Sequence, residues 1–257
     1  MNTPNEYDRF TFHDLMETLP PLETIEAGAP IRDAVRKMCN KDYSQLPVIK
    51  NKNCTGSVTS DSVLRRLRNA DQKGYYIDMD WPVERFLDKN LPQYVRSDDD
   101  LMKHVDWMAS KGFVLIGSPQ KLEAIITNYD LVLFFKRKTE AFLLLREIET
   151  TIRYLIGQTL SGQESKEALA LVKKEDESTT TSLTDLTFDN LRQLILANWT
   201  RFKNLFKDRK QTDKQLQIVR NMRNEVFHFR KPIEASRLQQ LRRLRDNYIK
   251  LATGLKR

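Results

Sequence analysis

The sequence predicts an α+β protein of two parts, with alternating strands and helices in the N-terminal half and helices alone in the C-terminal half. In the first half, short apolar runs are separated by polar turns, and one order of runs occurs twice. In the second half, apolar residues recur at steps of three and four, as on one face of a helix. Charge divides the chain at the same place. Residues 1–140 hold 20 Lys and Arg against 21 Asp and Glu, and residues 141–257 hold 23 against 14.

The first repeat covers about residues 24–67. After an extended start, Pro30 is expected at a helix N-terminus, where its fixed backbone angle suits the first turn. Apolar residues at helical spacing follow it. Strands are then expected at 46–49 and 56–59, joined by a polar turn, and a helix at 61–67.

The second repeat covers about residues 95–135 in the same order. Its first helix is expected at 98–108, its two strands at 113–116 and 124–127, and its last helix from Asp130.

No flexible linker separates the two halves. The helix from Asp130 is expected to continue into the second half, because no Gly or Pro interrupts it before Gly157. We therefore divide the chain into residues 1–138 and 139–257. A continuous rod could carry a shift in the first domain into the second, so that a ligand favours one of two arrangements. Four apolar residues keep the helical spacing: Leu144, Ile148, Ile152 and Leu155.

The second half is expected to form a bundle. Further helices are predicted at 189–206, 212–229 and 234–251, with Thr212–Gln215 as a capping box that begins the middle one. Pro232 is expected to end that helix.

Arg223, Asn224 and His228 combine residue types that can cleave RNA without a metal. The arginine can hold phosphate, the histidine can take a proton from a ribose 2′-hydroxyl, and the asparagine can hold the imidazole tautomer. On an ideal helix Arg223 and His228 are about 140° apart, so they meet one phosphate only if the helix end bends or a second copy completes the site. The alternative is a surface ion pair and a helix C-terminal cation favoured by the dipole.

The run Arg223-Asn224-x-x-x-His228 resembles the signature of the HEPN family. The resemblance covers residues 140–255 and implies an all-α four-helix bundle with metal-independent endoribonuclease activity. It also implies a homodimer in which Arg223 and His228 of each chain face one cleft, and a role as a toxin or phage-defence effector. The residues that fit the first two helices of the family are Glu149, Arg153, Trp199, Phe202 and Phe206.

The basic excess of the second half suits a partner held by phosphate contacts, and RNA is the partner that we expect. A solvated basic helix surface is the alternative. Arg220 lies four residues before Asn224, on the same flank of the helix. Three further arginines, Arg242, Arg243 and Arg245, are expected to contact phosphate.

The repeats of the first half resemble a pair of CBS domains. The segments that carry this resemblance are Ser44–Ile49 and Gly56–Thr59 in the first copy and Thr127-x-x-Asp130 in the second. The resemblance implies a regulatory adenine nucleotide (AMP, ADP or ATP), with phosphate at Thr127 and the ribose hydroxyls at Asp130. In the first copy Thr59 is present, but a serine stands where the Asp belongs and Asp61 comes one residue early. The alternative is a CBS pair that serves only as a dimerisation platform.

Composition narrows the remaining possibilities. Cys39 and Cys54 lack metal-ligand spacing, and we expect reduced thiols, no metal site and no cofactor for the chemistry. The start lacks the features of a signal peptide, and no apolar run approaches the roughly 20 residues of a membrane span, so a cytoplasmic protein is expected.

These observations together predict a nucleotide-regulated, metal-independent endoribonuclease that forms a homodimer through both domains. The alternative is a non-catalytic, nucleotide-sensing regulatory protein with a degenerate HEPN domain.

Overall fold

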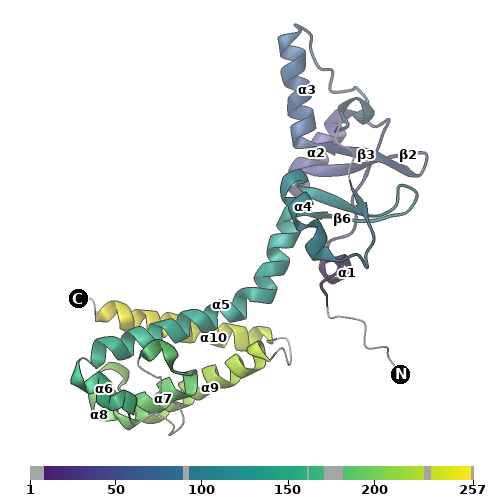
Figure 1. Cartoon of the computed structure of the whole chain (residues 1–257). Helices are drawn as coiled ribbons and strands as arrows, with labels where there is room; N and C mark the ends of the chain where they lie inside the picture. The colour runs from purple at the N-terminus through teal and green to yellow at the C-terminus, as the bar shows by residue number, and fades with distance from the viewer. Residues whose placement is uncertain (1–8, 89–92, 161, 171–181, 229–232, 256–257) are drawn as a thin grey trace, which may run out of the picture. The chain divides into compact units, whose positions relative to one another are not determined.

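The computed structural model describes residues 9–88, 93–160, 162–170, 182–228 and 233–255. The chain divides into two compact units, unit 1 (Met1–Phe135) and unit 2 (Lys136–Arg257). Unit 1 is a mixed α+β structure and unit 2 is helical in its described part (Figure 1).

The first repeat of unit 1 contains the predicted elements. A three-stranded sheet has the order β1-β2-β3, with β1 parallel and β3 antiparallel to β2. Asn51 and Lys52, both in left-handed conformations, form the turn between β2 and β3, so the polar turn is shorter than expected. The bounds are β1 Ile25–Glu26, α2 Ile31–Lys41, β2 Gln45–Lys50, β3 Asn53–Thr59, α3 Ser60–Gln72 and the 3₁₀ helix η1 Val83–Phe86.

The second repeat has the same topology, which confirms the internal repeat. Its sheet has the order β4-β5-β6, again with one parallel and one antiparallel pair. A short N-terminal helix, α1 (Phe12–Met16), contributes Phe12 and Leu15 to the core of this second repeat. The bounds are β4 Tyr94–Val95, the 3₁₀ helix η2 Leu101–His104, α4 Val105–Lys111, β5 Phe113–Gly117, β6 Leu122–Thr127 and α5 Asn128–Thr159.

The helix expected at 98–108 begins later than predicted. Asp99 and Asp100 accept hydrogen bonds from the backbone N–H groups of Arg96 (2.8 Å) and Met102 (3.0 Å). Short acidic side chains that bond to nearby backbone favour turns over helix interiors, so the chain enters the helix only after them.

Helix α5 runs without a break from Asn128 to Thr159, across the boundary between the two units (Figure 1). The prediction of one continuous helix is therefore confirmed. Gly157 lies inside its last turn.

The remaining helices of unit 2 differ in part from the prediction. The helix expected at 189–206 is two helices, and Asn198 separates them: its side-chain amide donates to the carbonyl of Leu194 (3.0 Å). The next helix begins at Arg209 and not at Thr212, because Asp208 caps it by accepting the N–H of Gln211 (2.9 Å). The bounds are α6 Gln163–Ala170, the 3₁₀ helix η3 Leu183–Asp185, α7 Phe188–Ala197, α8 Trp199–Phe206, α9 Arg209–Phe227 and α10 Ala235–Gly254.

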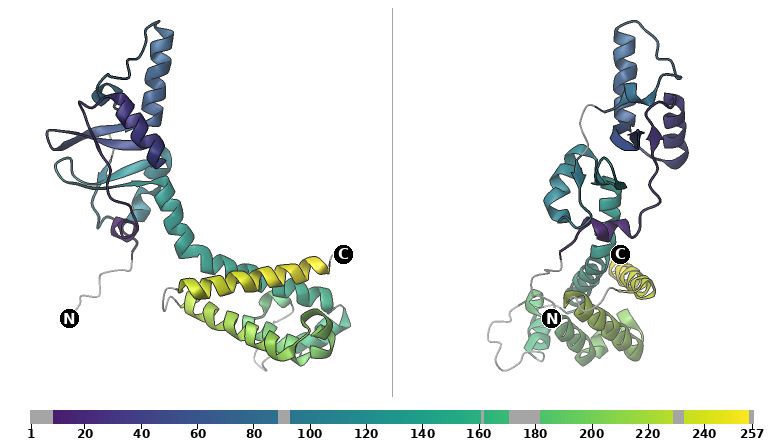
Figure 2. Two further views of the ribbon diagram at one scale, coloured as in Figure 1. Left: turned by 180° about the vertical axis from the view of Figure 1, so that it is seen from behind. Right: turned by 90° about the vertical axis from the view of Figure 1, so that its right-hand side faces the viewer.

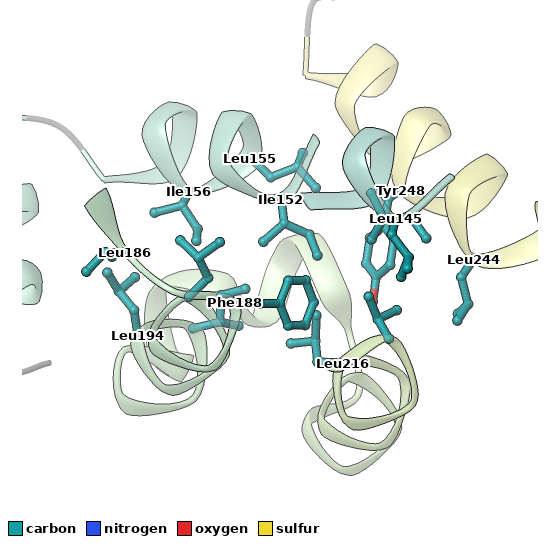
Figure 3. Packing of buried hydrophobic residues seen from close by; sticks show 14 of the residues in the cluster. Leu145, Ile152, Leu155, Ile156, Leu186, Phe188, Leu194, Leu216, Leu244 and Tyr248 are labelled. Carbon is teal, nitrogen blue, oxygen red and sulfur yellow. The ribbon is translucent and has the colours of Figure 1, made fainter. Parts of the chain in front are cut away.

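The core of unit 2 lies between α5 and the helices that follow it. Figure 3 shows Ile152 of α5, Phe188 of α7 and Leu216 of α9 pointing toward one another. Tyr248 of α10 is buried beside Leu145, whereas Ile249, the next residue of the helix, is 38% exposed. In both views of Figure 2, the helices of unit 2 can be followed by colour from the teal α5 to the yellow α10.

Candidate functional site

The predicted nucleotide residues of the second repeat form the N-terminal cap of α5. Thr127 donates to Oδ2 of Asp130 from its backbone N–H (2.8 Å) and from its hydroxyl (2.6 Å). The N–H of Asp130 in turn donates to Oγ1 of Thr127 (3.3 Å). This reciprocal capping box holds the carboxylate at the helix start. Oδ1 of Asp130 accepts no hydrogen bond from a described residue, which leaves it available to two vicinal hydroxyl donors.

The first repeat has a similar cap without the carboxylate. Thr59 is the N-cap of α3, and Ser62 stands at the position of Asp130: its hydroxyl accepts the N–H of Thr59 (2.9 Å). Asp61 is exposed and pairs with Arg65 on the same helix. The structure therefore does not place Asp61 in the role of Asp130. Asp88, which the sequence analysis did not identify, brings a carboxylate to the Thr59 hydroxyl (3.3 Å).

Each cap lies at the edge of a cleft in unit 1. The first, the Asp130 cleft, has a volume of about 600 Å³, a size typical of small-molecule pockets. It combines the β6–α5 junction of the second repeat with the α2–β2 junction of the first. Its lining includes Leu22, Lys41, Tyr43, Ile125, Thr127 and Asp130.

The second cleft, the Arg65 cleft, takes its helix N-terminus from the first repeat and its other wall from the second. It has a volume of 460 Å³ and combines the β3–α3 junction of the first repeat with the α4–β5 junction of the second. Lys111 lies 5.7 Å from the centre of the Trp107 ring, so a cation and an aromatic face meet at this edge. The sequence analysis missed these residues, because nothing in the spacing of the second repeat indicated that it would line the cleft of the first. The lining includes Thr59, Asp61, Arg65, Asp88, Trp107 and Lys111.

Both clefts contain paired charges of opposite sign. In the Arg65 cleft, Arg65 is neutralised by Asp61 and also approaches Asp88 (3.4 Å). In the Asp130 cleft, Lys41 lies 3.7 Å from Glu23. Lys37, which donates to Glu23 over 2.8 Å, holds the pKa of that carboxyl below its usual value. Each cleft therefore offers both carboxylate and cation.

In unit 2, Arg223 is held against α5. Its Nε atom donates to Oε2 of Glu149 (3.1 Å), and Arg153 donates to the other oxygen of the same carboxylate (2.6 Å). Glu149 has a side chain only 14% exposed. Arg153 also donates to the carbonyls of Leu183 (3.0 Å) and Leu186 (2.9 Å). Glu149 and Arg153 are thus part of a half-buried network.

His228 lies directly after the last residue of α9. It is the C-cap, with φ −98° and ψ 7°, and its backbone N–H donates to the carbonyl of Asn224 (3.2 Å). The helix thus ends between Arg223 and His228. Both Asn224 and His228 are exposed, and within the described residues neither side chain forms a hydrogen bond. Phe229, the last residue of the helix predicted at 212–229, and Pro232, expected to end that helix, lie outside the described residues.

Three of the four arginines expected to contact RNA are in ion pairs. Arg220 pairs with Asp189 (3.1 Å) and Arg242 with Glu140 (2.7 Å). Arg245 pairs with Glu147 (3.6 Å) and Asp246 (3.1 Å). Arg243 is exposed and forms no ion pair with a residue that the structure describes.

No group of three or more His, Cys, Asp or Glu in the described ranges is arranged to hold a metal ion. None of the helices that the structure describes is both long and apolar enough to span a membrane.

Comparisons with known proteins bear on unit 1. Residues 13–69 match the family model described as CBS domain. A signal-transduction protein with CBS domains from Burkholderia ambifaria MC40-6 is 18% identical, covers 49% of this chain and 93% of its own, and superposes with a TM-score of 0.43. The acetoin utilization protein AcuB from Vibrio cholerae is 18% identical; the match covers 49% of this chain and 90% of AcuB, with a TM-score of 0.41. CBSX2, solved in complex with AMP, is 21% identical; the match covers 50% of this chain and 99% of CBSX2, with a TM-score of 0.39.

A comparison with curated proteins yields no match to this chain. The family match covers α1 and most of the first repeat, including Thr59 at the start of α3. Residues 13–69 of this chain are therefore a CBS domain.

Proposed function

We propose that this protein is a nucleotide-regulated, metal-independent endoribonuclease, in which unit 1 binds an adenine nucleotide and unit 2 cleaves RNA. The observation that carries the proposal is the state of Arg223, which Glu149 holds by one nitrogen only. The remaining N–H groups of its guanidinium form no hydrogen bond with a described residue. This partly fixed cation lies five residues before an exposed histidine, in a half of the chain with a net charge of +9.

The chemistry uses general acid–base catalysis and electrostatic stabilisation. His228 takes the proton from a ribose 2′-hydroxyl, and the 2′-oxygen forms a bond to the neighbouring phosphorus as the bond to the 5′-oxygen breaks. The protonated His228 returns this proton to the leaving 5′-oxygen, and the products are a 2′,3′-cyclic phosphate and a 5′-hydroxyl. Arg223 stabilises the negative charge that develops on the phosphate oxygens. Asn224 orients the histidine or donates to phosphate once RNA is bound.

The proposed nucleotide site is the Asp130 cleft. The capping box leaves one carboxylate oxygen of Asp130 for the ribose hydroxyls, and the N-terminus of α5 favours phosphate. Aromatic and apolar residues, among them Tyr43 and Leu22, would cover the base. The Arg65 cleft, in which Thr59 and Asp61 were expected to bind nucleotide, is the weaker candidate because Ser62 replaces the carboxylate at the cap.

We further propose that the protein forms a homodimer through both units. In unit 1, Leu64 and Val132 stand at equivalent places, five residues after Thr59 and Thr127, and each is 63% exposed. An apolar groove of 340 Å³ lies beside Leu64, between α2 and α3. Apolar surface that recurs at equivalent places of two repeats supports a self-complementary contact. In unit 2, the partner chain would bring its own Arg223 and His228 to the cleft.

The second candidate function is a non-catalytic regulator that senses nucleotide and binds a partner without cleaving it. One observation favours it: Glu149 neutralises Arg223, and Arg220, Arg242 and Arg245 are likewise in ion pairs. Phosphate would have to compete with carboxylates for each of these cations.

Cleavage of total cellular RNA in EDTA distinguishes the two functions. The wild type is compared with His228→Ala and Arg223→Ala, with and without AMP or ATP. His13→Ala is the matched control, because His13 is exposed and lies in α1 of unit 1. Cleavage that survives EDTA and His13→Ala but is lost in both other variants supports the nuclease. Absence of cleavage by a folded, dimeric wild type with every nucleotide supports the regulator.

A further inference from the structure

Two exposed aromatic side chains of unit 2 lie against each other beside Arg223. Phe142 of α5 and Phe227 of α9 have ring centroids 5.4 Å apart, with ring planes inclined at 46°. They are 43% and 42% exposed, and within the described part of unit 2 no other Phe, Tyr or Trp is exposed to this degree. Phe188, Phe202 and Tyr248 are all buried in the core.

A cation, the guanidinium of Arg223, lies against one ring of this pair. The guanidinium carbon of Arg223 lies 4.9 Å from the centre of the Phe227 ring, a distance at which a cation is attracted to an aromatic face. Arg223 donates to Glu149 through Nε alone, so four of the five N–H donors of its guanidinium have no acceptor among the described residues. One surface therefore combines apolar ring area with unused donors for an anion.

From this geometry we infer that Phe142 and Phe227 form a stacking platform for an unpaired nucleobase of RNA, with the adjacent phosphate held by Arg223. The inference deepens the proposed function, on which it rests, by naming single-stranded RNA as the substrate class. Base–aromatic stacking accepts any base, because every base has a π face. The platform therefore selects unpaired nucleotides and not a sequence.

The chemistry requires an unpaired nucleotide at the same place. Attack of the 2′-oxygen requires that oxygen to lie in line with the leaving 5′-oxygen, an arrangement that the regular backbone of a duplex does not allow. RNA-binding proteins recognise unstacked bases on aromatic side chains in single strands and loops. A base stacked next to the phosphate clamp would hold the neighbouring sugar and phosphate near His228, the residue that follows Phe227.

A second copy of the chain is the other occupant to consider. An apolar partner surface on the two rings would remove the donors of Arg223 from water without supplying acceptors, which is unfavourable. A nucleotide covers the rings with its base and supplies acceptors with its phosphate. The combination on this surface thus fits RNA better than it fits an apolar protein face.

The test measures binding of a labelled single-stranded RNA oligonucleotide to the full-length chain carrying His228→Ala, which keeps the probe intact. In this background, Phe142→Ala is expected to weaken binding about fivefold to tenfold, as for the loss of one base–aromatic stack. Phe142→Trp should restore binding, and Phe142→Leu should not. Leu143→Ala is the matched control: Leu143 is the next residue of α5 and is 47% exposed, but it has no part in the ring pair. It should leave affinity unchanged.

A set of oligonucleotides, each with one abasic position, separates stacking from general loss of surface. At one position the missing base should remove the effect of Phe142→Ala, because the two changes delete the same contact. An equal effect at every position overturns the inference, as does unchanged affinity in Phe142→Ala or a change only in its oligomeric mass, which would identify a second copy as the occupant. Arg223→Ala distinguishes a failure of the stacking platform from a failure of the proposed function. If it abolishes binding while Phe142→Ala has no effect, the proposed function stands and the platform falls. If no RNA binds to the chain that carries His228→Ala alone, both fall.

Discussion

Glu149 of α5 and Arg223 of α9 lie in direct contact, with Nε of the arginine donating to Oε2 of the carboxylate over 3.1 Å. The other carboxylate oxygen accepts from Arg153, so a single acidic side chain holds two arginines. This arrangement both joins two helices of unit 2 and orients the guanidinium that we propose to contact phosphate.

Replacement of Glu149 should therefore affect stability and cleavage together. Glu149→Gln leaves Arg153 and Arg223 without a charged acceptor in a half-buried site, and we expect a loss of about 1–3 kcal/mol in the free energy of unfolding. At temperatures where the variant is folded, kcat should fall more than KM changes, because the orientation of Arg223 matters most in the transition state. Urea unfolding and steady-state cleavage measure the two effects.

Glu147→Gln is the matched control, since Glu147 lies on the same helix and pairs with Arg245 at a half-exposed position, over 3.6 Å. Exposed pairs contribute about 0–1 kcal/mol, so this variant should resemble the wild type in both measurements. Equal losses in the two variants would contradict a special role for Glu149.

Replacement of Asp130 should separate the two clefts of unit 1. Asp130→Ala removes the carboxylate that we propose to bind the ribose hydroxyls, which is also the acceptor in the Thr127 capping box. We expect at least a tenfold loss in affinity for AMP or ATP, and a loss of about 1 kcal/mol in stability from the cap. Titration calorimetry and thermal unfolding measure them.

Asp61→Ala serves as the comparison for this prediction, because Asp61 is exposed and its one ion pair with a described residue is with Arg65 along α3. It should change nucleotide affinity by less than about twofold and stability by less than about 0.5 kcal/mol. A larger loss of affinity in Asp61→Ala than in Asp130→Ala would assign the nucleotide to the Arg65 cleft.

Replacement of Tyr248 by phenylalanine should not lower the stability of the folded chain. Its ring is buried in the core of unit 2, and its hydroxyl forms no hydrogen bond with a described residue. Since a buried unpaired hydroxyl is unfavourable, Tyr248→Phe should leave stability unchanged or raise it by about 1 kcal/mol. Tyr248→Ala, which deletes the ring, should cost about 3–5 kcal/mol. A loss of more than about 1 kcal/mol in Tyr248→Phe would reveal a partner for the hydroxyl.

The same residue predicts a change of stability with pH. Burial raises the pKa of Tyr248 above its ordinary value, because the charged phenolate is disfavoured inside the core. Below the unfolded-state pKa of about 10 both states are protonated, and the residue adds no pH dependence. Above about pH 10 the unfolded chain loses the proton while the folded chain keeps it, so wild-type stability falls with rising pH. Unfolding measured between neutral and alkaline pH should show a smaller fall in Tyr248→Phe.

The continuity of α5 predicts how the ligand acts on cleavage. A Gly-Ser segment inserted after Lys138 would interrupt the helix, and we expect it to abolish the effect of nucleotide on cleavage while nucleotide affinity remains. An insertion of equal length made of Ala, Glu and Lys continues the helix and serves as the control. Unchanged nucleotide dependence in the Gly-Ser variant would contradict transmission through α5.

Much of the fold could be predicted from local sequence. The order of strands and helices in both repeats follows from apolar runs and turn residues, and the uninterrupted helix after Asp130 follows from the lack of Gly and Pro before Gly157. The missing acidic residue of the first repeat was also visible, because Ser62 and Asp130 stand equally far after Thr59 and Thr127.

The predictions that were wrong concern places where local signals compete. Thr212 has the sequence of a helix start, but Asp208 caps the helix four residues earlier and Thr212 is buried within its first turn. Similarly, both Tyr248 and Ile249 could face the core, and only the packing of α10 decided for the tyrosine. A break at Asn198 between two helices has no strong signal in a run of good helix formers.

The sequence by itself determined the two-part organisation, the internal repeat, the basic excess of the second half, and the spacing of Arg223 and His228. These are properties of neighbouring residues and of composition. Only the tertiary structure decided that Asp88 meets Thr59, that Trp107 and Lys111 of one repeat line the cleft of the other, and that Glu149 and Phe142 lie beside the motif of α9. Each of these contacts joins residues that are distant along the chain. Their partners depend on how helices and strands pack, which no local periodicity encodes.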